Sequence, residues 1–215
     1  MRRIKLNFSA QDVLCKLKIL FDYYFEYFFY TSTFKIKTIL FGIKLLGAVK
    51  CYGKIYLVRS PRSQIVIGNG VTLVSSTKRS ASSSLFSPIV LKTLSASAKI
   101  IIEDSVGLNG TSIVARSKTI KIGRGTMIAP NVTIMDSDFH ALWPPEKRLI
   151  TPNFESDASI IIGSNVWIGT RSIILKGVII GDNSIVAAGS VVVENIPPNI
   201  LVAGVPARPI RQLDE

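Results

Sequence analysis

The sequence predicts a mainly β protein built as a solenoid, with a helical segment at its N-terminus and a loop projecting from its middle. Three observations support this fold class. Aliphatic residues recur at every sixth position over much of residues 63–211. Residues 1–62 instead hold an aromatic, lysine-rich run. The six-residue period breaks at residues 136–159, where a Trp-Pro-Pro sequence and a cluster of charges indicate a loop.

The N-terminal segment, residues 1–62, is strongly basic. It holds 12 Lys and Arg residues against 3 acids, a net charge of +9, whereas residues 63–211 and the short tail 212–215 together carry only +3. A membrane-spanning helix needs about 20 mostly apolar residues, and charged residues interrupt this run, so we expect no span. One or two helices are expected, whose apolar face lies on an anionic membrane surface or packs on the protein or a partner subunit.

Other features of the N-terminal segment bound its environment. Met1-Arg2-Arg3 is not followed by the apolar core and cleavage site of a secretory signal. Cys15 and Cys51 form no CxxC pair, so we expect free thiols and no metal site. The segment holds no named nucleic-acid-binding motif, and no nucleic-acid partner is expected. A cytoplasmic protein is predicted, peripheral to the inner membrane face if the segment contacts lipid.

The repeat is clearest toward the C-terminus. Six β-branched aliphatics follow one another at a spacing of six: Ile162, Ile168, Ile174, Ile180, Val186 and Val192. Two shorter runs have the same spacing: Ile102, Leu108 and Val114, then Ile122, Ile128 and Ile134. A period of six suits neither a helix nor an ordinary strand. It suits stacked coils whose inward aliphatics form one continuous column, with Gly, Asn and Asp at the corners.

Two stretches depart from the period. Residues 74–98 are rich in serine and predict either irregular coils or an edge loop. Residues 136–159 predict an extruded loop, which begins near the only histidine of the chain, His140. Asp136 and Asp138 precede it by four and two positions, so in an extended segment both acids share its face. Either acid is therefore a candidate to orient the imidazole, with Asp138 the nearer; both acids capping the turn is the alternative.

Two stretches carry a resemblance to a known family: "IKIGRGTMIAPNVTIMDSDFH" and "IIIGSNVWIGTRSIILKGVIIGDNSIVAAGSVVVENIPPNILVAGVPARPIR". The chain resembles the hexapeptide-repeat acyltransferases, and within them the sugar and polysaccharide O-acetyltransferases, over about residues 63–211. The resemblance implies a left-handed parallel β-helix, acetyl-CoA as acyl donor, a sugar or glycan acceptor, and a homotrimer with its sites between subunits.

The resemblance also assigns roles to residues. His140 matches the catalytic base. Trp167, Gly169, Ala187 and Val193 match positions along the acyl-CoA site, and Arg208 and Arg211 stand where basic residues often meet the CoA phosphates. Asn109 approximates an acceptor-side asparagine, and Trp143 on the loop is either an anchor or a sugar-stacking surface.

The chemistry agrees with these roles. An alcohol is a poor nucleophile while it keeps its proton, and a positioned base contributes about 10²–10⁴-fold to its attack on a thioester. An imidazole, with an ordinary pKa of about 6.5, suits that task. The sequence therefore predicts O-acetylation of a sugar hydroxyl in a surface polysaccharide, a glycolipid or a precursor. The alternatives are N-acetylation of an amino sugar, xenobiotic acetylation, and a non-enzymatic scaffold. A metal-dependent hydratase is not expected from one histidine.

Overall fold

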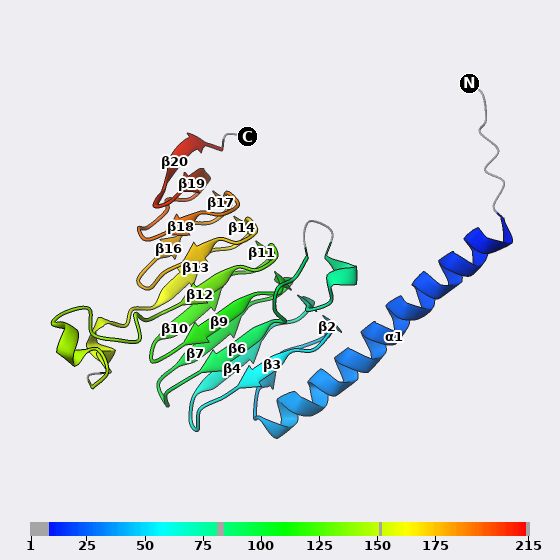
Figure 1. Cartoon of the computed structure of the whole chain (residues 1–215), viewed down its shortest axis with the longest axis horizontal. Coiled ribbons are helices and arrows are strands. Elements are labelled where there is room, and N and C mark those ends of the chain that lie inside the picture. Colours follow the sequence, from blue (N-terminus) through cyan, green and yellow to red (C-terminus); the bar gives the residue numbers. More distant parts are fainter. Residues whose placement is uncertain (1–8, 81–83, 151, 214–215) are drawn as a thin grey trace.

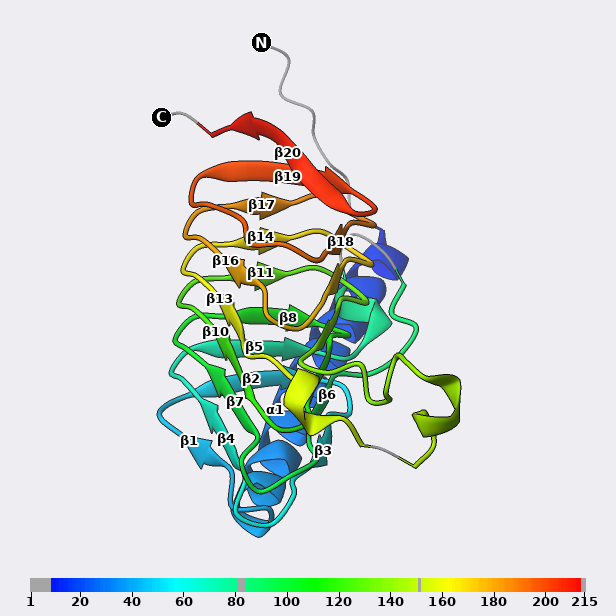
Figure 2. The ribbon, with the colours of Figure 1, turned by 90° about the vertical axis from the view of Figure 1, so that its left-hand side faces the viewer.

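The chain folds into stacked triangular coils with one long helix at the base (Figure 1 and Figure 2). The structure is a computed structural model that describes residues 9–80, 84–150 and 152–213. The basic start Met1-Arg2-Arg3 and the last two residues of the predicted tail lie outside the described residues. The fold is the left-handed parallel β-helix that the sequence predicts.

Each side of the triangle is one sheet of short strands stacked along the solenoid axis. Sheet A contains β1 (Lys44–Leu45), β4 (Gln64–Ile67), β7 (Lys99–Ile102), β10 (Thr119–Ile122), β13 (Ile160–Ile162) and β16 (Ile179–Ile180). Sheet B contains β2 (Val49–Tyr52), β5 (Val71–Val74), β8 (Gly107–Asn109), β11 (Met127–Ile128), β14 (Trp167–Ile168), β17 (Ile185–Val186), β19 (Ile200–Gly204) and β20 (Ala207–Gln212). Sheet C contains β3 (Tyr56–Val58), β6 (Val90–Thr93), β9 (Ser112–Ala115), β12 (Thr133–Met135), β15 (Ile173–Ile174) and β18 (Val191–Val192).

The inward column confirms the six-residue period. All six predicted aliphatics between Ile162 and Val192 are at most 1% exposed, and burial of each such side chain contributes about 1.5–3 kcal/mol. One predicted position is wrong. Ile113, not Val114, faces inward, since Ile113 is fully buried and pairs with Ile134. The turn after Leu108 is one residue shorter than the period, which moves the register by one.

Asparagines hold the corners in the left-handed conformation that β-branched residues resist. Asn165, Asn183 and Asn199 have φ values of 56°, 59° and 58°, a region that Asn tolerates better than most residues. Their side-chain amides also form a ladder, in which Asn165 donates to Asn183 at 3.3 Å and Asn183 donates to Asn199 at 2.9 Å. The corners therefore bond one coil to the next.

The N-terminal segment differs from the prediction at its end. The helix α1 (Ala10–Leu40) is followed directly by β1, β2 and β3, which pair in parallel with β4, β5 and β6. The first coil therefore begins at Lys44, not after residue 62. The C-terminal half of α1 packs on this coil, burying Phe34 and Thr31, and the Cys51 N–H donates to Thr31 Oγ1 at 3.0 Å. Among the described residues, no helix is both long and apolar enough to cross a bilayer.

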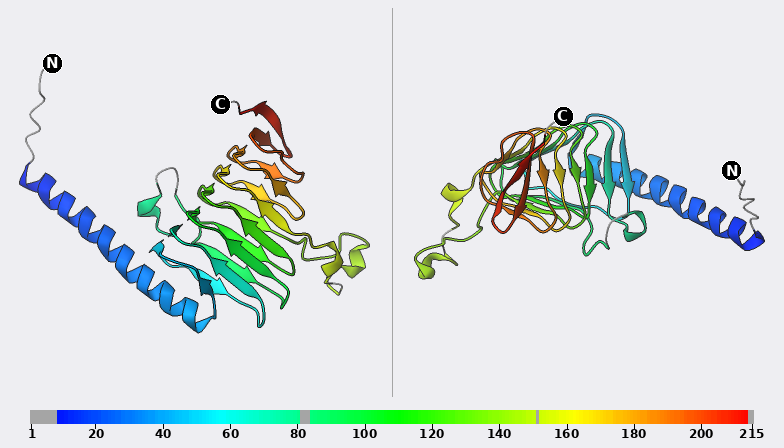
Figure 3. Two further views of the ribbon diagram at one scale, coloured as in Figure 1. Left: turned by 180° about the vertical axis from the view of Figure 1, so that it is seen from behind. Right: turned by 90° about the horizontal axis from the view of Figure 1, so that it is seen from above.

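Two segments leave the coils at different corners. Residues 75–89, with the short helix η1 (Thr77–Arg79), leave between sheets B and C, and the chain then returns to regular structure in β6. Residues 136–159, with η2 (Pro145–Lys147) and η3 (Phe154–Ser156), leave between sheets C and A. Figure 3 shows this second loop and α1 on opposite sides of the solenoid.

Candidate active site

His140 lies at the start of the 136–159 loop with its ring exposed. Its Nδ1 is 2.8 Å from the backbone carbonyl oxygen of Arg148, across the loop. A carbonyl oxygen can only accept a hydrogen bond, so Nδ1 must carry the proton. In the neutral imidazole, Nε2 then holds a lone pair. The loop thus presents an exposed imidazole whose Nε2 can accept a proton, because the Arg148 carbonyl oxygen fixes the tautomer of the ring.

Asp136 does not orient this imidazole, contrary to one of the two predicted arrangements. Its carboxylate is fully buried and accepts three backbone N–H groups, from Arg116 at 2.6 Å, Ser117 at 3.1 Å and Lys118 at 2.8 Å. The alternative, in which both acids cap the turn into the loop, does not hold for Asp136 either, because the turn that it caps follows β9 in the preceding coil.

Asp138 is also engaged elsewhere. Its Oδ2 is 2.5 Å from Nζ of Lys176, which lies in the turn between β15 and β16. Within the described residues, the hydrogen bond of the His140 ring goes to main chain and not to either acid. The physical reason is Phe139, whose φ of 65° breaks the extended geometry on which the two-residue alternation depends.

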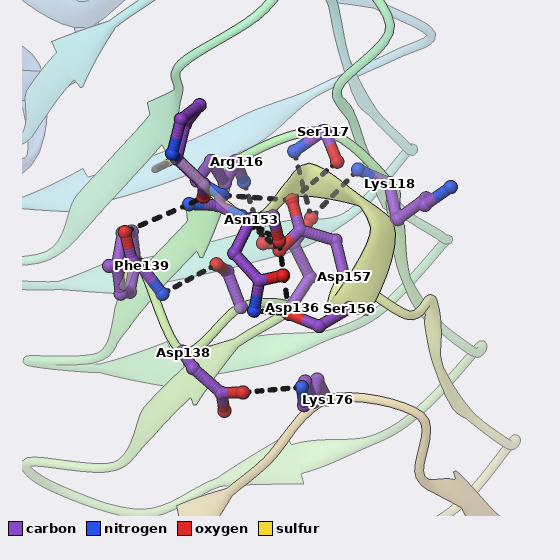
Figure 4. Close-up of polar contacts among 12 residues, drawn as sticks. Arg116, Ser117, Lys118, Asp136, Asp138, Phe139, Asn153, Ser156, Asp157 and Lys176 are labelled. Carbon is purple, nitrogen blue, oxygen red and sulfur yellow. Dashed lines mark hydrogen bonds and ion pairs between the residues drawn. The ribbon is translucent and has the colours of Figure 1, made fainter. Parts of the chain in front are cut away.

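A buried polar network joins both ends of the loop to the preceding coil (Figure 4). Arg116 is 5% exposed and forms a bidentate pair with Asp157, with Nε to Oδ2 at 2.9 Å and Nη2 to Oδ1 at 2.7 Å. Burial raises the pKa of Asp157, but hydrogen bonds from Arg116, Ser117 and Ser137 outweigh it and hold this pKa below its ordinary value. Neither Arg116 nor Asp157 is predicted from the sequence, because Arg116 follows β9 at a corner and Asp157 lies in the loop, where the six-residue period assigns no contacts.

Sheet B carries a groove of about 590 Å³. It brings together four predicted site residues: Asn109, Trp167, Gly169 and Ala187. Trp167 is 51% exposed, which confirms that its indole points outward. Gly169 also has a packing reason to be glycine, since a Cβ there would lie 2.4 Å from the backbone nitrogen of Ala188.

The groove also has walls that sequence reasoning missed. Met127 and Ile185 stand directly before and after Trp167 in the stack, because Met127 pairs with Trp167 and Trp167 pairs with Ile185. Each of the two lies one coil from Trp167 and, like Trp167, directly before an inward aliphatic, which is a signal that the sequence contains. Arg79, from the 75–89 segment, closes one side of the groove, and no repeat could have indicated it.

The remaining predicted residues lie outside the groove walls. Arg211 lies in β20 and pairs with Leu201 of β19, which lines the groove, so Arg211 stands next to the groove. Arg208 is exposed and forms an ion pair with Glu194 at 3.0 Å. Val193 is 42% exposed, and Trp143 is 78% exposed on the 136–159 loop.

His140 and the groove occupy different corners of one chain. The groove residues Ala129, Pro130 and Thr170 follow sheet B strands at the corner where sheet B meets sheet C. The loop with His140 leaves at the corner between sheets C and A. Sheet C therefore stands between them, and the described lining of the groove includes no residue of the 136–159 loop.

Comparison with known proteins finds relatives of the six-residue repeat. Residues 159–193 match the model of the bacterial transferase hexapeptide, six repeats. The chain carries the hexapeptide repeats of bacterial transferases. It is 44% identical over 98 residues to galactoside O-acetyltransferase of Escherichia coli K12, a match that spans 45% of this chain and 46% of the relative. It is 35% identical over 119 residues to WbbJ of the same strain, provisionally named a lipopolysaccharide biosynthesis O-acetyl transferase, spanning 53% and 60%.

A solved structure of galactoside acetyltransferase in complex with coenzyme A superposes with a TM-score of 0.50 and 27% sequence identity. The match covers 80% of this chain and 65% of that one. The chain thus spans about half the length of the curated relatives that it matches.

Proposed function

We propose that the protein is an acetyl-CoA-dependent O-acetyltransferase that acts on a sugar hydroxyl, with His140 as the general base. The observation that carries the proposal is the hydrogen bond from His140 Nδ1 to the Arg148 carbonyl oxygen. In the neutral ring that bond leaves Nε2 as the proton acceptor of an exposed residue, and no group in the described part of the chain binds it. The only histidine of the chain thus has the tautomer that removal of a hydroxyl proton requires.

The reaction needs one base and no protein nucleophile. Nε2 of His140 takes the proton of the acceptor hydroxyl as its oxygen attacks the thioester carbonyl. The resulting imidazolium keeps the hydrogen bond from Nδ1 to the Arg148 carbonyl oxygen, and that bond stabilises the positive charge of the ring. Collapse of the tetrahedral intermediate breaks the carbon–sulfur bond, and the proton passes from Nε2 to the departing thiolate. The products are a sugar ester and free CoA.

The groove on sheet B suits the acyl donor. Its walls combine apolar surface from Met127 and Ile185 with the indole of Trp167, and the basic residue Arg211 lies beside it. An apolar channel next to an arginine matches a ligand with a pantetheine arm and phosphates. The galactoside acetyltransferase that shares the fold binds coenzyme A, which supports the assignment.

The separation of base and groove supports a site made by two copies. If one reaction uses both, His140 of one copy must meet the groove of another, since sheet C stands between them in one chain. A cyclic homotrimer provides such contacts three times, each by the same interface. We therefore include a homotrimer in the proposal.

The outer face of α1 bears on where the acceptor is held. Leu14, Phe21 and Phe28 lie on the side away from the solenoid and are 65%, 68% and 62% exposed. Helical spacing places Lys18 and Lys35 on the same side. An apolar-aromatic stripe flanked by lysines suits an anionic membrane surface. Contact there would bring the enzyme to a lipid-linked sugar precursor or a glycolipid.

One assay tests the acetyl transfer. Untagged protein is incubated with acetyl-CoA and either a galactoside or an amino sugar, while released CoA thiol and acetylated product are measured. We expect thiol release that depends on the galactoside, with an ester as product, and its loss in His140→Ala. An amide product with the amino sugar alone would favour the N-acetyltransferase alternative. No turnover with either acceptor class, in folded protein, would favour the scaffold.

A further inference from the structure

The guanidinium of Arg116 donates all of its hydrogen bonds to the loop that carries His140. Two of its N–H groups bind Asp157, two bind the carbonyl oxygens of Phe139 and Pro152, and one binds that of Asn153 (Figure 4). These five bonds are the full complement of an arginine. One bond is made just before the histidine, and the other four lie where the loop returns. Arg116 thus joins the segment that leaves the solenoid to the segment that returns to it.

The residue next to His140 is held in a costly conformation. Phe139 has a φ of 65°, which is unfavourable for a bulky side chain. Both of its backbone polar groups are held by side chains: its N–H donates to Ser137 Oγ at 2.8 Å, and its carbonyl oxygen accepts from Arg116 Nη1 at 3.0 Å. The direction in which the chain presents His140 therefore depends on the Arg116 contact.

Arg116 is itself held firmly. It follows β9, its backbone N–H donates to the buried Asp136 at 2.6 Å, and its guanidinium stacks on the Phe154 ring at 4.5 Å. Ser117 Oγ adds a further bond to Asp157 at 2.5 Å. Arg116 belongs to the solenoid because it directly follows β9, whereas every residue that its guanidinium holds belongs to the 136–159 segment.

We propose that Arg116 is a positioning residue that sets the orientation of the His140 imidazole through the Phe139 carbonyl and the returning strand of the loop. The inference rests on the proposed function of His140 as the base. A purely structural role is the competing explanation: in that case loss of Arg116 changes stability but leaves the imidazole in place.

The lone histidine makes the distinction measurable. In untagged protein labelled with ¹⁵N-histidine, the imidazole signals come from His140 alone, and the nitrogen shifts report which nitrogen carries the proton. Arg116→Lys keeps the positive charge beside Asp157 but cannot bridge the same four residues. We expect wild type to show the Nδ1–H tautomer and Arg116→Lys to show exchange between tautomers. We expect kcat to fall about 10- to 100-fold, the scale of a small displacement of a catalytic group, with the KM for acetyl-CoA unchanged.

Controls separate this proposal from the proposed function. Arg124→Lys, an exposed arginine that pairs with Asp104 at 3.8 Å, should leave both the spectrum and kcat as in wild type. If Arg116→Lys does not fold, Asp157→Asn, which keeps the shape of the side chain, should shift the spectrum and kcat in the same direction. An unchanged tautomer with unchanged kcat in the folded variant would overturn the proposal. Full activity of His140→Ala would instead overturn the proposed function, and the spectrum would still report on Arg116.

Discussion

At His140, a main-chain carbonyl oxygen accepts the hydrogen bond that a carboxylate accepts from the histidine in many catalytic sites. The Arg148 oxygen, 2.8 Å from Nδ1, fixes the tautomer without adding a second charge. The exposed ring needs no support from the aliphatic core, and the nearest acid, Asp138, is paired with Lys176. If His140 is the base, as proposed, catalysis and folding depend on different atoms of the loop, and the histidine is suitable for substitution.

Replacing His140 with alanine should lower kcat for acetyl transfer by about 10²–10⁴-fold, the usual contribution of a general base. The unfolding temperature should not change, because the side chain is exposed and its single described hydrogen bond is to a surface loop. Thiol release and thermal unfolding measured on the same preparation check both statements. A variant that turns over like wild type contradicts the assignment of the base.

Trp167 offers a second test at the donor side. Its indole is half exposed in the groove, so Trp167→Ala should remove contact with acetyl-CoA and leave the core untouched. We expect the KM for acetyl-CoA to rise about tenfold, or ~1.4 kcal/mol, with a smaller effect on kcat. Ile161→Ala, at the corresponding outward position of sheet A, serves as the matched control. Equal effects of the two substitutions would argue against a donor site in the groove.

The site residues show how far sequence reasoning reaches at this scale. The outward indole of Trp167 and the extruded position of His140 follow from the six-residue period, since one flanks an inward aliphatic and the other stands where the period stops. The roles of Asp136 and Asp138 do not follow. The left-handed conformation of Phe139 redirects the chain, and three backbone N–H groups after β9 donate hydrogen bonds to Asp136.

The helix α1 shows two faces with different uses. Its inner face buries Phe34 and bonds to the first coil, where the hydroxyls of Tyr23 and Tyr52 are 2.9 Å apart. Its outer face leaves Leu14, Phe21 and Phe28 largely exposed. The sequence left packing and membrane contact open as alternatives for this segment, and the inner face now accounts for the packing.

Vesicle binding tests the outer face. The full-length protein should cosediment with vesicles that contain anionic phosphatidylglycerol and less with neutral phosphatidylcholine, and added salt should weaken the binding. Phe21→Ser with Phe28→Ser should weaken it by roughly tenfold per ring, since each ring leaves apolar surroundings. Phe86→Ser, which removes an equally exposed phenyl group outside α1, is the control. Vesicle binding by the double variant that equals wild-type binding would argue against a membrane contact at this face. Loss of the trimer in the double variant would instead assign the face to a partner subunit.

The first coil can be probed through its thiol. Cys51 is fully buried between α1 and the coil, and burial raises the pKa of its thiol to about 12 from an ordinary 9.0. A thiol reagent at pH 8 should therefore modify the exposed Cys15 alone, and Cys51 should react only on unfolding. Because the folded-state pKa is raised, this group contributes stability below pH 9 and loses that contribution as the pH rises toward about 12. Rapid reaction of both thiols in native protein would show that α1 does not cover the coil.

The start of the solenoid was missed for a chemical reason. Ile43, Val49 and Ile55 are all buried and are spaced by six, so the period does extend into the N-terminal segment. Cys51 occupies a core position that an aliphatic residue holds in later coils, and lysines and tyrosines surround the run. Composition therefore obscured a spacing that was present in the sequence.

The whole molecule was predictable wherever each coil repeats the one before it. A period of six, three times per coil, determines the three sheets and the column between them, which is why the fold and the position of the 136–159 loop follow from the sequence. Contacts between non-repeating segments do not follow from a period. Arg116 with Asp157, and Arg79 against the groove, belong to this second kind.

The central claim is that His140 of one copy acts on a donor bound in the groove of another, and subunit mixing tests it most directly. His140→Ala removes the base, and Ala188→Trp fills the groove at an exposed wall residue, so each variant alone should be inactive. Co-expressed in equal amounts, they should regain about a quarter of wild-type activity, because every mixed cyclic trimer contains one interface with both intact parts. Mixed trimers without activity would contradict a site shared between copies.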